Sequence, residues 1–78
     1  MRKKRTSFEI QKEILQILSD GKERLLSTLR ERCETNYYTI IRNCHILQSR
    51  AEIEIIERNG HKFVRITERG KKTLELLK

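Results

Sequence analysis

The side chains best suited to specific hydrogen bonding lie in residues 36–50, where apolar residues recur with the period of a helix. If Ile40, Cys44 and Leu47 turn inward, the other side of this helix carries both polar and apolar side chains. These candidate site residues are Tyr38, Thr39, Arg42, Asn43 and Ile46. Arginine can donate two hydrogen bonds to guanine, asparagine can pair with adenine, and isoleucine can contact a thymine methyl group. The segment is therefore a candidate for reading base edges, with Asn43 at the edge of the outward face and with Tyr38 and Thr39 placed for phosphates.

Three basic or titratable side chains flank a tight turn in the segment Arg58-Asn59-Gly60-His61-Lys62. The pair Asn59-Gly60 predicts a two-residue hairpin turn, because such a turn requires positive φ at both positions. The shape suits contact with a phosphate backbone or a minor groove, through Arg58, His61 and Lys62. Charged hairpin tips also occur for solubility alone, so the alternative is that these side chains make no contact with DNA.

Two further groups are candidate DNA contacts. The first is the basic run Arg2, Lys3, Lys4 and Arg5, which we expect to form a mobile arm over residues 1–6. The second is Ser27 and Thr28 at the start of a short helix that ends near Cys33, with Ser27 expected to cap it.

Cys33 and Cys44 are expected to face each other between the helices on either side of residues 34–36, where they either form an intramolecular disulfide or stay as buried thiols. With His45 and His61 they match no recognised zinc spacing, so we expect no metal site. The sequence contains no phosphate-binding glycine loop and no nucleophile placed near a base. We therefore expect neither catalysis nor a cofactor.

The charge balance favours an anionic partner. The chain has 78 residues, with 18 Lys+Arg against 11 Asp+Glu, for a formal net charge of +7. That length predicts one small domain, placed at residues 7–78. No apolar run approaches the roughly 20 residues that a membrane span requires, and no signal peptide is recognisable. We expect a cytoplasmic protein.

Several local signals predict the elements that position these side chains. Thr6 and Glu9 form a capping box before a helix at about residues 7–20, and Gly21 is its expected C-cap. Leu25-Leu26 is a candidate strand. A last helix follows Thr67, which we expect to cap it.

The hairpin turn sets the pairing of two strands. If Asn59 and Gly60 occupy the turn, Arg58 lies opposite His61. The following pairs continue away from the turn, one residue on each strand at a time, and end with Ile53 opposite Ile66. This register gathers four β-branched residues on one face, which we expect to be the core face. They are Ile53, Ile55, Val64 and Ile66. Ile56 and Phe63 then lie on the opposite face.

The predicted order of elements is helix, short strand, two closely spaced helices, hairpin and helix, which is typical of a winged helix-turn-helix. The chain resembles the small archaeal winged-helix regulators in three motifs, found at Ile14–Gly21, Asn36–Tyr38 and Ile66–Gly70. It departs from them at Arg50–Ile53, where they usually have a Gly-Leu-Ile-like sequence. The resemblance implies an α+β fold, with a three-helix core, a hairpin wing and a short C-terminal helix. It further implies sequence-specific binding of double-stranded DNA in transcription regulation, with residues 36–50 in the major groove and the wing at residues 57–62 on the backbone or minor groove.

Two alternatives remain open at this level. Many winged helices dock on proteins, and Ile56 and Phe63 on the outer wing face would suit such docking. Nonspecific architectural binding to DNA, or binding to RNA, would use the charge without a sequence preference. We also expect a homodimer, because one such domain contacts little DNA and because Ile56, Phe63 and the leucines of the last helix offer apolar surface.

Overall fold

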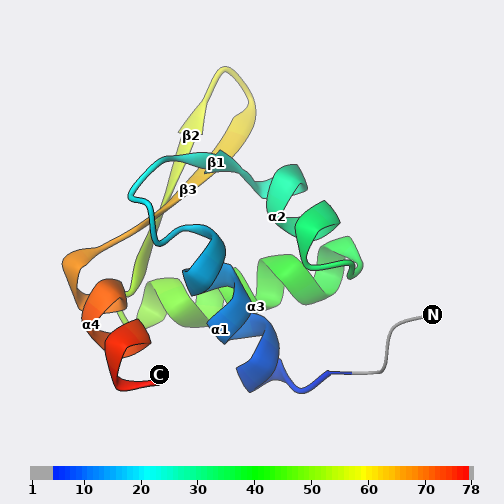
Figure 1. The fold of residues 1–78 in the computed structure, drawn as a ribbon. Coiled ribbons are helices and arrows are strands. Elements are labelled where there is room, and N and C mark those ends of the chain that lie inside the picture. The colour runs from blue at the N-terminus through cyan, green and yellow to red at the C-terminus, as the bar shows by residue number, and fades with distance from the viewer. Residues whose placement is uncertain (1–4, 78) are drawn as a thin grey trace.

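The computed structural model describes residues 5–77. Four helices and three strands follow in the predicted order (Figure 1). They are α1 (Ser7–Ile17), β1 (Arg24–Leu25), α2 (Leu26–Arg32), α3 (Tyr37–Ser49), β2 (Ile53–Arg58), β3 (His61–Ile66) and α4 (Glu68–Leu76). The α+β winged helix-turn-helix prediction is therefore confirmed.

The three-stranded antiparallel sheet has the order β1-β3-β2, and β2 and β3 extend from the helices as the wing (Figure 1). The hairpin register is the predicted one, from Arg58 opposite His61 back to Ile53 opposite Ile66. Asn59 and Gly60 supply the turn with φ values of 51° and 77°. The predicted core face is correct, because Ile53, Val64 and Ile66 are buried and Ile55 packs against the core.

The helix starts follow the capping residues. The Glu9 amide donates to the Thr6 hydroxyl at 3.1 Å, and the Thr6 amide donates to the Glu9 carboxylate at 2.9 Å. The bond from the Thr6 amide to the Glu9 carboxylate, followed by a second bond from the Thr6 hydroxyl, lowers the pKa of the Glu9 carboxyl. Asn36 accepts from the Thr39 amide at 2.8 Å, and Thr67 accepts from the Gly70 amide at 3.1 Å.

Two predicted boundaries are wrong. Helix α1 ends at Ile17 instead of near residue 20, because Ser19 and Asp20 bond to local backbone in a turn that precedes Gly21. Strand β1 starts one residue early and runs directly into α2, so Leu25 occupies the N-cap position and makes no side-chain cap bond. Ser27 therefore lies inside the first turn of α2 and is not its cap.

The core lies between α1, α2, α3 and one face of the sheet, with α4 packed on α1. Its members include Ile14, Leu18, Leu29, Ile40, Cys44, Leu47 and Val64, all 0% exposed. Cys33, at the end of α2, is also buried there. This packing holds α3 across the domain with one side facing out (Figure 1).

Replacing Ala51 with glycine should stabilise the fold. Ala51 has a φ of 61° at the corner between α3 and β2, a conformation that costs an L-residue about 1 kcal/mol and costs glycine little. We expect Ala51→Gly to raise the free energy of unfolding by about 0.5–1 kcal/mol in urea titrations. Gln48→Gly, at an exposed position inside α3, should instead lower it by about 1 kcal/mol. Equal losses from both substitutions would contradict this explanation.

Candidate nucleic-acid interface

The outward side of α3 forms a shallow hollow of about 500 Å³, which we call the α3 groove. Its lining residues are Tyr38, Thr39, Ile41, Arg42, His45, Ile46 and Ser49. Four of the five side chains assigned to base or phosphate contact thus share one surface. Tyr38 is 85% exposed, and Ile41 and Ile46 form a partly buried apolar floor. A hydrogen-bonding rim around an apolar floor suits base edges that carry both polar atoms and a methyl group.

His45 also lines the α3 groove and was missed as a site residue in the sequence analysis. It follows Arg42 by three positions, so the two side chains lie on neighbouring turns of one helix face. That spacing was the signal available in the sequence.

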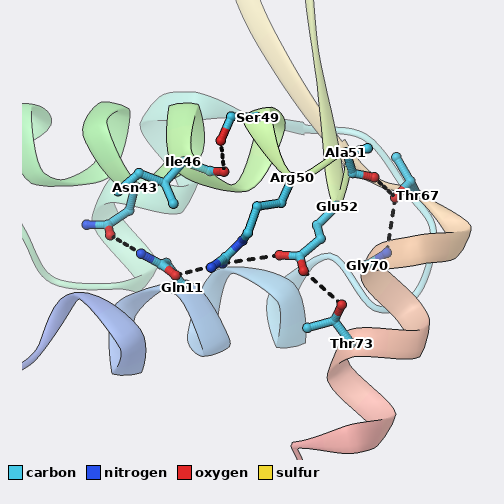
Figure 2. Close-up of polar contacts among 10 residues, drawn as sticks. All are labelled: Gln11, Asn43, Ile46, Ser49, Arg50, Ala51, Glu52, Thr67, Gly70 and Thr73. Carbon is cyan, nitrogen blue, oxygen red and sulfur yellow. Dashed lines mark hydrogen bonds and ion pairs between the residues drawn. The ribbon is translucent and has the colours of Figure 1, made fainter.

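Asn43 is not available to DNA, so its assignment to adenine is wrong. Its side chain is 1% exposed and turns into the helix packing. Its Oδ1 accepts from Gln11 Nε2 at 2.9 Å, and its Nδ2 donates to the Thr39 carbonyl at 2.8 Å. Both ends of the amide are thus engaged inside the protein, and Figure 2 shows the bond to Gln11. Gln11 lies among the apolar positions of α1. A polar residue on that buried face requires a buried hydrogen-bond partner, and this is the signal in the sequence that could have indicated Asn43.

A second hollow, of about 220 Å³, lies between the starts of α2 and α3 and the turn of the wing; we call it the wing groove. It is lined by Leu25, Leu26, Ser27, Tyr37, Gly60, His61 and Lys62. The fold thus brings Ser27 next to the predicted wing residues His61 and Lys62, although more than 30 positions separate them in the sequence.

Tyr37 lines the wing groove and is not part of the core. It is 51% exposed. Tyr37 is the first residue of α3, and the buried stripe begins one turn later, at Ile40. Its ring and hydroxyl therefore become part of the candidate interface.

Among the described residues, no acidic side chain lines either groove. The linings instead contain Arg42 and Lys62, together with His45 and His61. Both grooves therefore present positive charge and hydrogen-bond donors, which favours a polyanionic partner.

Arg58 lies outside both grooves. Its guanidinium pairs with the Glu23 carboxylate and stacks over Phe63, with Cζ 4.7 Å from the ring centroid. A phosphate would have to compete with Glu23 for this side chain. Thr28 is half-buried on α2 and also lines neither groove.

Arg5 belongs to the folded domain and not to a mobile arm, which corrects the prediction for this residue. Its guanidinium pairs with the Glu13 carboxylate and donates to the Cys33 carbonyl, and its side chain is 15% exposed. The other predicted arm residues, Arg2, Lys3 and Lys4, lie outside the described residues.

Cys33 and Cys44 are both buried, and the structure has them as thiols and not as a disulfide. Burial, reinforced by the nearby Cys33, raises the pKa of Cys44 from 9.0 to about 12. At neutral pH both side chains behave as small apolar groups that fill the junction between α2 and α3.

The raised pKa of Cys44 predicts a loss of stability in alkali. Above pH 9 the unfolded chain releases the Cys44 proton while the folded chain retains it up to about pH 12, so rising pH favours unfolding. The free energy of unfolding should fall by about 1 kcal/mol by pH 10 from this group. Urea titrations between about pH 8 and pH 10 measure the fall. Cys44→Ala should show a shallower slope, and an equal slope would contradict the prediction.

Within residues 5–77 no group of three or more His, Cys, Asp or Glu side chains could hold a metal ion. Over the same residues, no helix has the length and apolar character needed to cross a membrane.

Solved structures with the same fold come from bacteria and archaea. The chain is similar to BpsR of Bordetella bronchiseptica, with a TM-score of 0.78 and 19% identity over 87% of this chain and 50% of that one. For the transcriptional regulator BldR of Sulfolobus solfataricus the TM-score is 0.80, with 20% identity and the same coverage. A third similar structure is a homodimeric winged helix-turn-helix DNA-binding domain of Mycobacterium bovis, described as a possible ArsR-family regulator. Its TM-score is 0.76, with 23% identity over 88% of this chain and 64% of that one.

These similarities establish the winged-helix fold. The chain spans about half the length of BpsR and BldR. No family model matches the sequence, and no curated protein matches it. Since the structural neighbours include bacterial as well as archaeal proteins, the archaeal part of the resemblance stays a prediction.

Proposed function

We propose that this protein binds double-stranded DNA in a sequence-specific manner and regulates transcription, with α3 in the major groove and the wing on the adjacent backbone or minor groove. The observation that carries the proposal is the pair of grooves on one helix-turn-helix and wing, whose linings within residues 5–77 present basic and titratable side chains and no acidic one. In this arrangement Arg42, His45 and Ile46 face base edges. Ser27, Tyr37 and Lys62 are placed for phosphates. Such a role requires no cofactor and no catalytic step.

The structural neighbours support this role. Their descriptions name DNA binding for BpsR, transcription regulation for BldR and a DNA-binding domain for the Mycobacterium bovis protein. In a cell without a nucleus, as in the bacteria and archaea of the structural neighbours, a protein that works in this way would act in the cytoplasm, beside the DNA that it binds.

In vitro selection from a pool of random duplexes tests the proposal. A sequence-specific regulator should enrich one motif, and its affinity for that motif should exceed its affinity for random duplex by about a thousandfold or more. Affinity for both should fall steeply as salt rises, because each phosphate contact releases counterions. Binding without an enriched motif would indicate the architectural alternative, and preference for a single-stranded or RNA pool would indicate the RNA alternative.

Protein docking is the second candidate function, and the outer wing face is the observation that favours it. Ile56 and Phe63 lie half-buried on this face, and Leu25 beside them is 37% exposed. A domain that only docks on proteins should show almost no affinity for random duplex at low salt. That result would replace the DNA-binding proposal with this one.

We further propose that the protein is a homodimer. Two large apolar side chains away from the grooves support this, since Phe8 is 57% exposed and Leu76 is 85% exposed. The Mycobacterium bovis neighbour is described as homodimeric. Light scattering at micromolar concentration, with and without DNA, should give twice the mass of 9.4 kDa in the free protein. A palindromic motif from the selection would agree with this symmetry, and a monomeric mass under both conditions would refute it.

A further inference from the structure

A line of polar contacts lies behind the α3 groove, where α3 packs on α1; it is buried at Gln11 and Asn43 and half-exposed at Arg50 (Figure 2). Gln11 of α1 is 8% exposed and Asn43 of α3 is 1% exposed. The Gln11 amide bonds at both ends. Its Nε2 donates to Asn43 at 2.9 Å, and its Oε1 accepts from Arg50 Nη2 at 2.8 Å.

The line continues from Arg50 to α4. Arg50 Nη2 lies 3.2 Å from Glu52 Oε1, and Glu52 Oε2 accepts from the Thr73 hydroxyl at 2.8 Å. Glu52 is buried at the corner where α3 turns into the wing. One connected set of polar side chains therefore joins the middle of α3 to its end, to the start of the wing and to α4.

Gln11 bonds to Asn43 within α3 and to the half-exposed Arg50, the C-cap residue of α3, and the two lie seven residues or about 10 Å apart along the helix axis. Hydrogen bonds require defined distances and angles, whereas apolar contacts tolerate sliding and rotation. Two directional bonds at separate turns therefore restrict both the rotation of α3 about its axis and its position along that axis.

This restraint acts on the side of α3 that faces away from it. Asn43 follows Arg42 directly in the sequence, and its Nδ2 also donates to the carbonyl of Thr39, one turn earlier. A rotation of α3 that breaks the bond to Gln11 therefore also moves Arg42 and Ile46 within the α3 groove. Displacements of this size alter hydrogen-bond geometry at a base edge.

We propose that Gln11 and Asn43 are positioning residues that determine the base preference of α3 without contacting DNA. This inference rests on the proposed function. A leucine at each position would fill similar space, but it would leave the rotation of α3 to nondirectional packing. Buried polar groups can select one packing arrangement in this way.

The decisive variant is the double substitution Gln11→Leu with Asn43→Leu. It should remain as stable as the wild type, because replacing both partners of a buried hydrogen bond with apolar groups is nearly neutral. Its affinity for random duplex and its salt dependence should stay unchanged. The ratio of selected-site to random-duplex affinity should fall about tenfold. A double variant that keeps both the stability and the affinity ratio of the wild type would show that Gln11 and Asn43 have only a structural role, and it would overturn the proposal.

Two single variants complete the design. Gln11→Leu alone leaves Oδ1 of Asn43 buried without its hydrogen-bond donor and should lower both stability and the affinity ratio. Ile14→Val, in the same helix and fully buried, should lower stability without changing the ratio. If the double variant does not fold, Gln11→Glu takes its place, since it keeps the acceptor for Arg50 and removes the donor to Asn43. An unchanged ratio in Gln11→Glu would then overturn the proposal.

Residual dipolar couplings of the free protein separate this inference from the proposed function. The orientation of α3 relative to α1 should change in the double variant, or in Gln11→Glu in its place, and should stay as in the wild type in Ile14→Val. If selection enriches no motif, the proposed function fails, and the couplings still decide the inference. An unchanged orientation of α3 would overturn it.

Discussion

Gly70→Ala should lower the free energy of unfolding by about 3 kcal/mol or more, a large part of the total for a domain of this size. A Cβ atom at Gly70 would lie 2.1 Å from the Glu52 carbonyl oxygen and 2.7 Å from Cγ1 of Ile66. The Glu52 oxygen cannot retreat easily, because it also accepts from the Thr67 amide at 3.0 Å. Urea or thermal denaturation followed by circular dichroism measures the loss.

Gly21→Ala is the matched control. Gly21 has a φ of 82°, and a Cβ there would meet no atom within 4 Å. Its replacement should cost only the backbone strain, about 1 kcal/mol. If Gly70→Ala loses no more than Gly21→Ala, the approach of α4 to the corner between α3 and β2 is not tight enough to exclude a methyl group.

Arg42→Ala should weaken binding to the selected DNA site by about 1–3 kcal/mol and relax the preference at one base pair. Arg42 is exposed on the rim of the α3 groove, where its guanidinium can donate two hydrogen bonds to a guanine edge. Fluorescence anisotropy with the selected duplex and with single-base variants of it measures both effects. Random duplex should lose less affinity, because it offers no matched base.

Lys62→Ala is the comparison for Arg42→Ala, since Lys62 lies in the wing groove and is assigned to phosphate. Lys62→Ala should weaken binding to the selected and the random duplex equally, and it should reduce the slope of log affinity against log salt concentration by about 1. Equal losses of Arg42→Ala on selected and random duplexes would contradict its base-reading role.

Short-range signals account for most of the fold that could be predicted from the sequence. The caps at Thr6, Asn36 and Thr67 bond within three residues of themselves, so their effect does not depend on the rest of the chain. The pair Asn59-Gly60 determines its turn, and hence the register of the six residue pairs between β2 and β3, for the same reason. The boundaries of α1 and α2 were harder to predict, because side chains in turns compete with helix bonds and β1 passes directly into α2.

The outward face of α3 could be predicted from helical period alone, and Tyr38, Thr39, Arg42 and Ile46 lie on it as expected. The same period puts Asn43 on the buried side, three residues after Ile40. Its polar side chain nevertheless favoured an assignment to the surface, because its partner Gln11 is 32 residues away and no local signal identifies that partner. Arg5 raised the same difficulty, since its bond to the Cys33 carbonyl spans 28 residues. Such pairs form only once the helices have packed.

The sequence by itself therefore determined the elements, the hairpin register, the positive charge and the exposed side of α3, because all of these arise from interactions between near neighbours or from composition. Only the tertiary structure decided which polar residues are buried, that Ser27 and Tyr37 join the wing turn in one groove, and that Gly70 must lack a side chain. These features depend on contacts between distant segments, and local periodicity contains no information about which distant side chain completes a buried hydrogen bond.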